Sequence, residues 1–310
     1  MIVILGPTAS GKTQIATRLA SRIDGEIISA DSRQVYRRMD IGTGKDLSEY
    51  GNVPYHLIDI REPGTKYNLF QYQHDFRIAY DDIMSRGKMP ILCGGTGLYI
   101  EAVLKGYQLA PVPENPELRK QLQGKTLEEL TDILKDLKRR NGSEMHNTTD
   151  VDSCQRAIRA IEIETVAGHR SIQQVPDPAI QSSPVFGIAI DRELRREKIS
   201  RRLRARLEEG MVEEIQSLLN EGIAPEDLIY YGLEYKYVTL YLTGQMSYDK
   251  MVSELEIAIH QFAKRQMTWF RGMERRGISI TWLPVPQNEE QMQQTIELII
   301  NNSKFKIQNS

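Results

Sequence analysis

The chain has 310 residues, of which 40% are hydrophobic and 7% aromatic, and this length allows one large domain and a smaller one. A formal net charge of −2 argues against wholesale coating of nucleic acid, although local clusters of charge can still form a binding surface. The two cysteines, Cys93 and Cys154, form no Cys-x-x-Cys pair, so neither a disulfide framework nor a thiolate zinc site is indicated.

The chain begins with a short apolar run, Met1 to Leu5, that Gly6 and Pro7 interrupt. It has no basic leader and is far too short for a signal peptide or a membrane span. We therefore expect a cytoplasmic protein. Since no exposed heptad or apolar strip stands out, we also expect a monomer.

Strands and helices are predicted to alternate along the chain. Short apolar runs predict strands at 3–5, 27–30, 55–60, 91–93, 186–190 and 278–283. A helix with one apolar face, 13–23, follows the first strand, and helical stretches separate most of the others. This alternation predicts an α/β fold, a P-loop NTPase-like core with a mostly parallel sheet flanked by helices.

The segment 110–184 differs in amino-acid composition from the rest of the chain. Three prolines open it and three close it, and its polar helices, predicted at 116–122, 127–140 and 151–167, are only modestly apolar. We interpret 110–184 as an inserted helical domain that can move relative to a catalytic core made of 1–109 and 185–300. A polar tail, 301–310, is expected to follow.

The first glycine-rich segment, Gly6-Pro7-Thr8-Ala9-Ser10-Gly11-Lys12-Thr13, fits G-x-x-x-x-G-K-[ST] between a predicted strand and a predicted helix. The glycines allow the backbone N–H groups to point inward, and the following helix N-terminus favours anions. Lys12 can reach phosphate oxygens and the Thr13 hydroxyl can bind Mg²⁺. A site for a diphosphate or longer phosphate chain is predicted, whereas a mere glycine turn would need neither side chain.

Kinases, NTPases and enzymes that use prenyl diphosphates share such a loop, so other motifs must identify the phosphate compound. Asp31 opens Asp31-Ser32-Arg33-Gln34-Val35-Tyr36 after the second strand, at the sheet edge where open α/β folds bind ligands. Its carboxylate could accept a proton or orient an amine, or it could merely cap the following turn. A second glycine-rich turn, Gly94-Gly95-Thr96-Gly97-Leu98-Tyr99, follows the strand at 91–93.

Basic residues gather in two places. The run 192–206 contains eight lysines and arginines, which by itself is typical of a solvated helix face. Near the C-terminus, helical spacing places Trp269 on an apolar stripe, which favours core packing over stacking on a base. The opposite face of that helix is a basic stripe suited to a phosphate backbone, made of His260, Lys264, Arg271 and Arg275.

Together these motifs resemble the tRNA dimethylallyltransferase family of bacterial type. The resemblance rests on GPTASGKT, DSRQVYR with DIGTGK, YHLID, GGTGLY, QRAIRAIE and KRQMTWFRG, and it runs from Gly6 to about Gly272. It implies transfer of a dimethylallyl group from dimethylallyl diphosphate to N6 of the adenosine immediately 3′ of the anticodon in tRNA, with release of diphosphate.

The resemblance implies roles at the matching positions. The loop from Gly6 to Thr13 would bind the diphosphate, with Lys12, Thr13 and Mg²⁺ stabilising the leaving group and Asp31 accepting the N6 proton. The target base would be swung out of the anticodon stack. The residues expected to line the tRNA path are Asp31, Ser32, Arg33, Gln34, Thr96, Arg119, Gln155, Arg156, Ala157, Ile158, Arg159, Lys264, Arg265, Gln266, Met267, Thr268, Trp269, Phe270 and Arg271.

Two positions depart from the family pattern. His260, expected to be neutral at pH 7, stands where the family commonly has arginine, and Glu234 stands where a Gly-Tyr-(Lys or Arg) element has its glycine. Neither change touches the phosphate loop or Asp31. We expect them to alter tRNA preference or affinity more readily than chemistry.

Three other functions are compatible with part of the pattern. A dimethylallyltransferase acting on AMP, ADP or ATP would share the phosphate loop and Asp31 but has little use for the insertion and the basic stripe. A P-loop small-molecule kinase leaves GGTGLY and KRQMTWFR unexplained. An RNA-binding protein with a vestigial site would not need Lys12, Thr13 and Asp31 intact.

Overall fold

A computed structural model describes residues 1–107, 112–142, 151–167 and 177–307. The chain divides into two compact units, Met1–Lys105 with Pro176–Ser310, and Gly106–Val175. We call the first the core and the second the insertion. No helix in the described ranges is both long enough and apolar enough to cross a membrane.

The core contains a six-stranded sheet in the order β3-β2-β4-β1-β5-β6, and every neighbouring pair is parallel. All six predicted strands are confirmed, as β1 (Ile2–Leu5), β2 (Gly25–Ala30), β3 (Tyr55–His56), β4 (Met89–Gly94), β5 (Val185–Ala189) and β6 (Ile280–Pro284). The third is shorter than the predicted 55–60, because Leu57 and Asp59 have φ angles of 63° and 56°, which a continuing strand does not allow.

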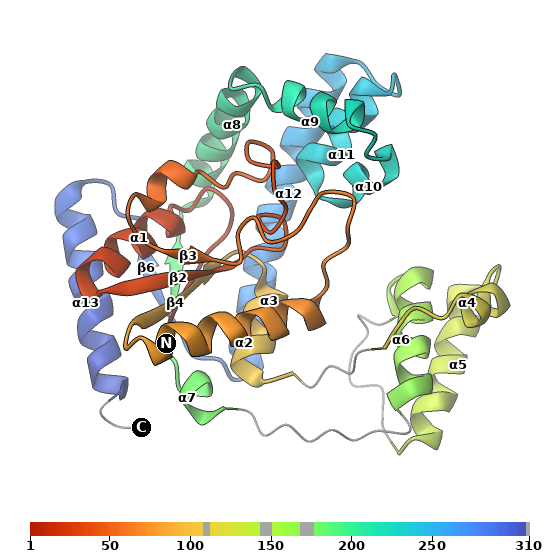
Figure 1. The fold of residues 1–310 in the computed structure, drawn as a ribbon, viewed down its shortest axis with the longest axis horizontal. Coiled ribbons are helices and arrows are strands. Elements are labelled where there is room, and N and C mark those ends of the chain that lie inside the picture. Colours follow the sequence, from red (N-terminus) through yellow and green to blue (C-terminus); the bar gives the residue numbers. More distant parts are fainter. Residues whose placement is uncertain (108–111, 143–150, 168–176, 308–310) are drawn as a thin grey trace. The chain divides into compact units, whose positions relative to one another are not determined.

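Alternate residues of each strand pack on opposite faces of the sheet, as the period of two requires. Ile2 and Ile4 face α1 (Lys12–Ile23) and α13 (Glu289–Ile307). Val3 and Leu5 face the other side, where α2 (Leu69–Ser85) and α3 (Gly97–Lys105) pack (Figure 1). Both faces are covered, so β1 and β2 are fully buried and β4 is buried except at Met89.

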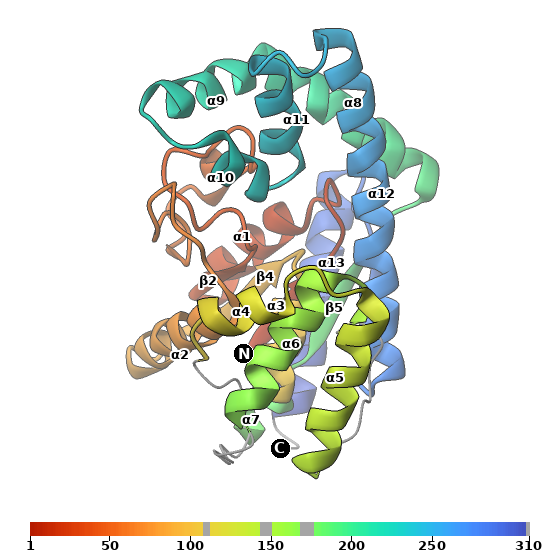
Figure 2. The same ribbon diagram turned by 90° about the vertical axis from the view of Figure 1, so that its right-hand side faces the viewer.

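A second group of helices follows β5 and packs around the long helix α12 (Tyr248–Arg275) (Figure 2). The helices of this group are α8 (Arg192–Glu208), α9 (Met211–Asn220), α10 (Pro225–Tyr230) and α11 (Leu233–Leu242). Their buried side chains, including Leu203, Ile215 and Leu255, belong to the same apolar cluster as the α2–α3 face of the sheet. The sheet and these helices therefore form one continuous core.

The insertion contains α4 (Pro116–Leu122), α5 (Leu127–Arg140) and α6 (Cys154–Ala167). The first two match the predicted bounds, and the third begins three residues later than the predicted 151–167. A small apolar cluster that includes Leu130, Leu134 and Ile161 holds α5 against α6.

The expected ends of the insertion and of the core need correction. Helix α7 (Pro178–Gln181) buries Ile180 in the apolar cluster of the core, so this segment belongs to the core and not to the insertion as 110–184 implied. Helix α13 continues to Ile307, so 301–307 are helical and not the start of a tail. Packing of Ile296 and Ile299 against the sheet anchors that helix.

Candidate functional site

Three loops leave the sheet side by side at the carboxyl ends of its strands. Leu5 of β1 and Ala30 of β2 are both in register with Gly94 of β4. The residues that follow each strand, Gly6 and Asp31 among them, therefore start neighbouring loops. We call them the phosphate loop (Gly6 to Thr13), the Asp31 loop (Asp31 to Lys45) and the Gly95 loop (Gly95 to Leu98).

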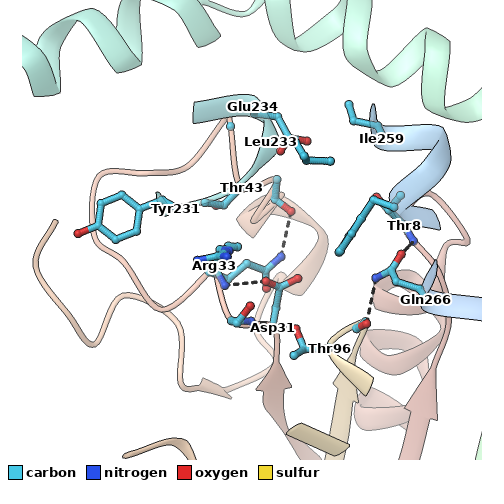
Figure 3. Close-up of a pocket in the computed structure, with 18 of the residues that line it drawn as sticks. Thr8, Asp31, Arg33, Thr43, Thr96, Tyr231, Leu233, Glu234, Ile259 and Gln266 are labelled. Carbon is cyan, nitrogen blue, oxygen red and sulfur yellow. Dashed lines mark hydrogen bonds between the residues drawn. The ribbon is translucent and has the colours of Figure 1, made fainter. Parts of the chain in front are cut away.

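A cavity of about 530 Å³ opens above these loops, in the range of small-molecule sites. Figure 3 shows Asp31 at the tip of its strand, with Glu234 and Ile259 on walls that the helices contribute. The lining side chains come from the phosphate loop, the Asp31 loop, the Gly95 loop and α12, from α8 and from the α10–α11 junction. They include Thr8, Lys12, Thr13, Asp31, Arg33, Gln34, Tyr50, Thr96, Arg202, Arg206, Tyr230, Tyr235, Phe262, Arg265, Gln266 and Trp269.

The phosphate loop has the backbone that its sequence predicts. Gly11 has φ 77°, a left-handed conformation that favours glycine, and α1 starts at the next residue, Lys12. Lys12 and Thr13 both line the cavity. Burial lowers the pKa of Lys12, although the nearby Cys93 and Asp31 partly oppose the shift. A lysine that is desolvated in this way gains from an anionic partner.

Two arginines of α8 reach the cavity, which the sequence did not single out within the basic run. Arg202 is half-buried, and its charge contributes to the lowered pKa of Lys12. Arg206 is 8% exposed, and its Nη2 atom is buried without a hydrogen-bond partner. The run is thus divided: these two arginines face inward, whereas Arg192, Arg196, Arg201 and Arg204 are exposed.

The Asp31 side chain is held by its own loop. Its Oδ1 atom accepts a hydrogen bond of 2.8 Å from the backbone N–H of Arg33, so the turn-capping reading is correct in part. A carboxylate accepts several hydrogen bonds, and Asp31 also lines the cavity, so the bond orients the group without exhausting it.

Hydrogen bonds join the Asp31 loop to its neighbours. The Ser32 N–H donates to the Thr96 hydroxyl at 3.1 Å, which links the Asp31 loop to the Gly95 loop. The Gln34 amide donates to the Gly44 carbonyl at 3.1 Å and accepts from Ser29. Gln34 and Thr96 line the cavity, but their polar groups already have partners within the protein.

The segment Lys264 to Arg271 lies on α12, and its side chains alternate between an exposed and a buried face of the helix. Lys264, Arg265, Thr268 and Arg271 are exposed, and Met267 is half-buried. Phe270 is completely buried, so its expected place on the tRNA path is wrong, because it packs in the core. Trp269 is half-buried: it packs against the core cluster as expected, but it also lines the cavity, and its Nε1 atom is buried without a partner.

Exposed cations of α8 and α12 come near each other. The pKa of Arg195 is lowered by burial first and then by the positive charges of Arg192 and Arg271. Arg192 and Arg195 of α8 and Arg271 of α12 thus contribute to one basic surface, in which Asp191 partly offsets the positive charge. His260 lies beside it, and burial together with the Arg196 charge lowers its pKa, although the nearby Glu256 partly opposes the shift.

Aromatic side chains form another part of the site that the sequence did not reveal. Tyr230 is 44% exposed and lines the cavity, with the Arg33 guanidinium 5.4 Å and the Lys66 ammonium 6.0 Å from its ring centroid. The adjacent Tyr231 is buried, and its hydroxyl bonds Gly64 N and Thr65 O. The Tyr-Tyr pair at 230–231 was the only sequence signal.

Glu234, the departure from the family glycine, lies in the first turn of α11, which accommodates it without a break. Its Oε1 atom is 3.9 Å from Nη1 of Arg206, and both side chains line the cavity. Burial raises the pKa of Glu234, and the Arg206 charge opposes that shift. Glu234 therefore adds a partly buried ion pair with Arg206 to the cavity wall.

The expected tRNA contacts of the insertion are arranged around a buried carboxylate. Glu162 is 1% exposed and accepts two bonds from Arg119, at 2.7 and 3.0 Å, and one from Arg159 at 2.9 Å. Ala157 is completely buried and Ile158 half-buried in the α5–α6 cluster, so tRNA contact through the Ala157 side chain is wrong. Gln155 and Arg156 are exposed.

Comparison with known proteins agrees with the motif pattern. The profile of the family described as IPP transferase matches residues 34–273, and that of isopentenyl transferase matches residues 1–50. A protein named tRNA dimethylallyltransferase 1 from Parabacteroides distasonis is 62% identical over 97% of this chain and 98% of its own. One named tRNA dimethylallyltransferase 2 from Trichlorobacter lovleyi is 54% identical over 91% of each chain.

Solved structures show the same fold. The tRNA isopentenylpyrophosphate transferase of Bacillus halodurans aligns with a TM-score of 0.73 and 30% identity over 99% of this chain and 97% of that one. A eukaryotic dimethylallyltransferase acting on tRNA aligns with a TM-score of 0.72 and 22% identity, covering 93% of this chain and 74% of that one. The phosphate loop, the Asp31 loop and α12 thus lie within a shared architecture, and this chain belongs to the IPP transferase family.

Proposed function

We propose that this chain transfers a dimethylallyl group from dimethylallyl diphosphate to N6 of the adenosine immediately 3′ of the anticodon in tRNA. The observation that carries the proposal is the single cavity in which the phosphate loop and Asp31 meet. One side of that cavity suits a diphosphate, and another presents a carboxylate to an acceptor. Basic helix faces beside it suit an RNA backbone.

The donor would bind with its diphosphate on the phosphate loop and the first turn of α1. Lys12 and Arg202 supply positive charge to the leaving oxygen atoms, and backbone N–H groups at the start of α1 have no intrahelical partners. Stabilising a departing diphosphate weakens the allylic C–O bond. The apolar side chains of Ile259 and Phe262, which line the cavity, suit the prenyl group.

The residues present fit a magnesium ion bound together with the diphosphate. Thr13 lines the cavity in the first turn of α1, where its hydroxyl can be one ligand, and Mg²⁺ usually takes few protein ligands beside substrate phosphates and water. The described residues hold no cluster of three or more His, Cys, Asp or Glu that could bind a metal. Bound there, the ion would neutralise charge on the leaving diphosphate.

Asp31 would act on the acceptor amine. In the transfer step a bond forms between N6 and the allylic carbon, while the C–O bond breaks and its electron pair leaves with the diphosphate. The N6 proton passes to the Asp31 carboxylate, which the Arg33 N–H holds in place. General-base assistance is needed because an exocyclic amine is a weak nucleophile.

RNA would approach over the exposed cations of α8 and α12, with the insertion providing a further contact through Gln155 and Arg156. Tyr230, between Arg33 and Lys66, can stack on an unpaired base at the cavity. Swinging the adenosine out of the anticodon stack costs a few kcal/mol, which such contacts offset.

The test uses purified protein, Mg²⁺ and dimethylallyl diphosphate labelled in the prenyl group. Three parallel reactions contain an anticodon stem-loop with adenosine 3′ of the anticodon, the same stem-loop with guanosine there, or AMP. We expect label on the adenosine stem-loop alone. Label on AMP alone would indicate a free-nucleotide prenyltransferase. Hydrolysis of ATP supplied in a fourth reaction, without prenyl transfer in the other three, would indicate a kinase; either result overturns the proposal.

A further inference from the structure

The side chain of Gln266 joins two of the three loops. Its Oε1 atom accepts a 2.9 Å hydrogen bond from the backbone N–H of Thr8, in the phosphate loop. Its Nε2 atom donates a 2.9 Å bond to the carbonyl of Gly95. Gln266 is 8% exposed, and Figure 3 shows its amide beside Thr8 with both bonds drawn.

These bonds continue into the loop that carries the proposed base. Gly95 precedes Thr96, whose hydroxyl accepts from the Ser32 N–H, next to Asp31. The Thr96 N–H donates to the carbonyl of Ala30, the residue before Asp31. A connected set of hydrogen bonds thus runs from the phosphate loop through α12 and the Gly95 loop to Ala30 and Ser32, the residues on either side of Asp31.

The glutamine amide suits the position. The side chain must accept a hydrogen bond from one loop and donate one to the other. The amide oxygen accepts and the amide nitrogen donates, and neither atom carries a charge. Close approach is built in at Gly95, since a Cβ atom there would lie 2.5 Å from Nε2 of Gln266. The family resemblance implied that Gln266 lines the tRNA path, but both ends of its amide bond to the protein itself.

We propose that Gln266 is a positioning residue that holds the donor-binding phosphate loop and the acceptor-binding Asp31 loop in register. This inference rests on the proposed prenyl transfer. It also explains why a buried glutamine lies next to exposed cations on α12. Its task is to keep the allylic carbon within bonding distance of N6. The remote basic face of α12 would bind RNA, and its buried face would align the reactants.

Loss of register has a chemical signature. In the productive step, N6 attacks the allylic carbon and its proton passes to Asp31. If the loops separate, water can take the place of N6: the C–O bond breaks, a water oxygen bonds to the carbon, and the products are prenyl alcohol, diphosphate and a proton. The ratio of prenyl alcohol to prenylated RNA therefore measures alignment independently of folding.

The experiment compares three variants of the full chain. Gln266→Met keeps the volume and removes both hydrogen bonds. Gln266→Glu keeps an acceptor for Thr8 but places a carboxylate against the Gly95 carbonyl. Gln261→Met is the matched control, because Gln261 is an exposed glutamine of the same helix. Each is assayed with labelled dimethylallyl diphosphate and the adenosine stem-loop, with RNA affinity measured separately.

For Gln266→Met we expect the turnover number to fall roughly 10²-fold, the loss typical of a misplacement of about 1 Å. For Gln266→Glu we expect a loss of at least about tenfold, because the buried Gly95 carbonyl loses its donor and faces a carboxylate oxygen instead. In both, the share of donor released as prenyl alcohol rises, while the dissociation constant for RNA stays within about twofold of wild type since no RNA-facing charge changes. Gln261→Met matches wild type in every respect.

Two results would overturn the inference. One is a weakened RNA affinity in both Gln266 variants with an unchanged ratio of alcohol to prenylated RNA, which would make Gln266 an RNA contact. The other is turnover and product ratio like wild type in Gln266→Glu, which also decides the matter if Gln266→Met does not fold. Failure of the proposed function is seen separately, as wild-type protein that prenylates no RNA.

Discussion

The core cavity and the insertion both contain charged residues of the family motifs, but the two regions differ in whether these side chains find partners within the protein. In the insertion, Arg119 and Arg159 converge on the buried Glu162, and Arg119 also pairs with Glu114. In the cavity, Lys12 is desolvated and Arg206 keeps a buried nitrogen without a partner. Charge that is satisfied inside the fold stabilises it, whereas charge that faces a cavity unsatisfied is available to a ligand. The same motif evidence thus predicts a structural role in one region and a chemical role in the other.

The largest effect of any substitution is expected in the cavity, when the proposed base Asp31 is removed. Asp31→Asn keeps the size of the side chain and an acceptor for the Arg33 N–H but cannot take a proton. We expect the turnover number to fall by about 10²- to 10⁴-fold, the contribution usual for a general base. Single-turnover transfer to the stem-loop measures it. Asp249→Asn, at an exposed aspartate of α12, is the control, and an equal loss of RNA affinity in Asp31→Asn would make Asp31 a docking residue instead.

The next largest effect is expected at Lys12. Lys12→Met should raise the KM for dimethylallyl diphosphate roughly 10²-fold, because a charge-assisted contact to the diphosphate is lost. Because burial lowers the pKa of Lys12, the wild-type enzyme should lose donor affinity as pH rises, at a pH below the ordinary lysine pKa. The KM for donor between pH 7 and pH 10 checks this. A profile that is flat over that range in wild type, or as steep in Lys12→Met, would contradict the assignment.

A smaller effect is expected for the aromatic wall of the cavity. Tyr230→Ala should raise the KM for the stem-loop about tenfold, since stacking of one base on an aromatic ring contributes about 1–3 kcal/mol. Tyr230→Phe keeps the ring and should restore the wild-type value. Tyr248→Ala removes another exposed tyrosine, on the first turn of α12, and serves as the control. Loss of function in Tyr230→Phe as well would point to the hydroxyl and not to stacking.

The smallest effect on transfer, and a clear effect on stability, is expected in the insertion. Burial raises the pKa of Glu162, but hydrogen bonds from Arg119, Asn115 N and Arg159 outweigh it and bring the pKa to about 2. A depressed pKa adds stability that is fully present above the unfolded value of 4.5 and is lost as pH falls toward 2. We expect Glu162→Gln to destabilise the insertion by on the order of 2 kcal/mol at pH 7.

That difference should shrink when the pH is lowered from 6 to 3.5, because the wild-type carboxylate begins to lose its advantage. Thermal unfolding at the two pH values measures it, and Glu128→Gln, at an exposed carboxylate of α5, is the control. A pH-independent difference would mean that the bonds of Glu162 do not depend on its charge.

Much of the fold was predictable because its signals are local. Buried strands are short apolar runs, and the phosphate loop follows from glycines and a lysine at fixed spacing, so β1, β2, β4, β5 and β6 appeared where expected. The end of β3 was not predicted, since the hydrophobic pattern of the sequence does not reveal the left-handed backbone of Leu57 and Asp59. The place of α7 in the core was missed as well, because Ile180 finds its apolar partners far away in the sequence.

The amino-acid sequence alone determined the parallel α/β core, the phosphate loop, Asp31 at the end of its strand and the family. Only the tertiary structure decided which charges face the cavity: Arg202 and Arg206 point inward from a run that looked uniformly basic. It also turned Gln266 from an expected RNA contact into a bridge between two loops. The physical reason is that helical spacing tells which residues share a face, but only packing against other helices decides what that face meets.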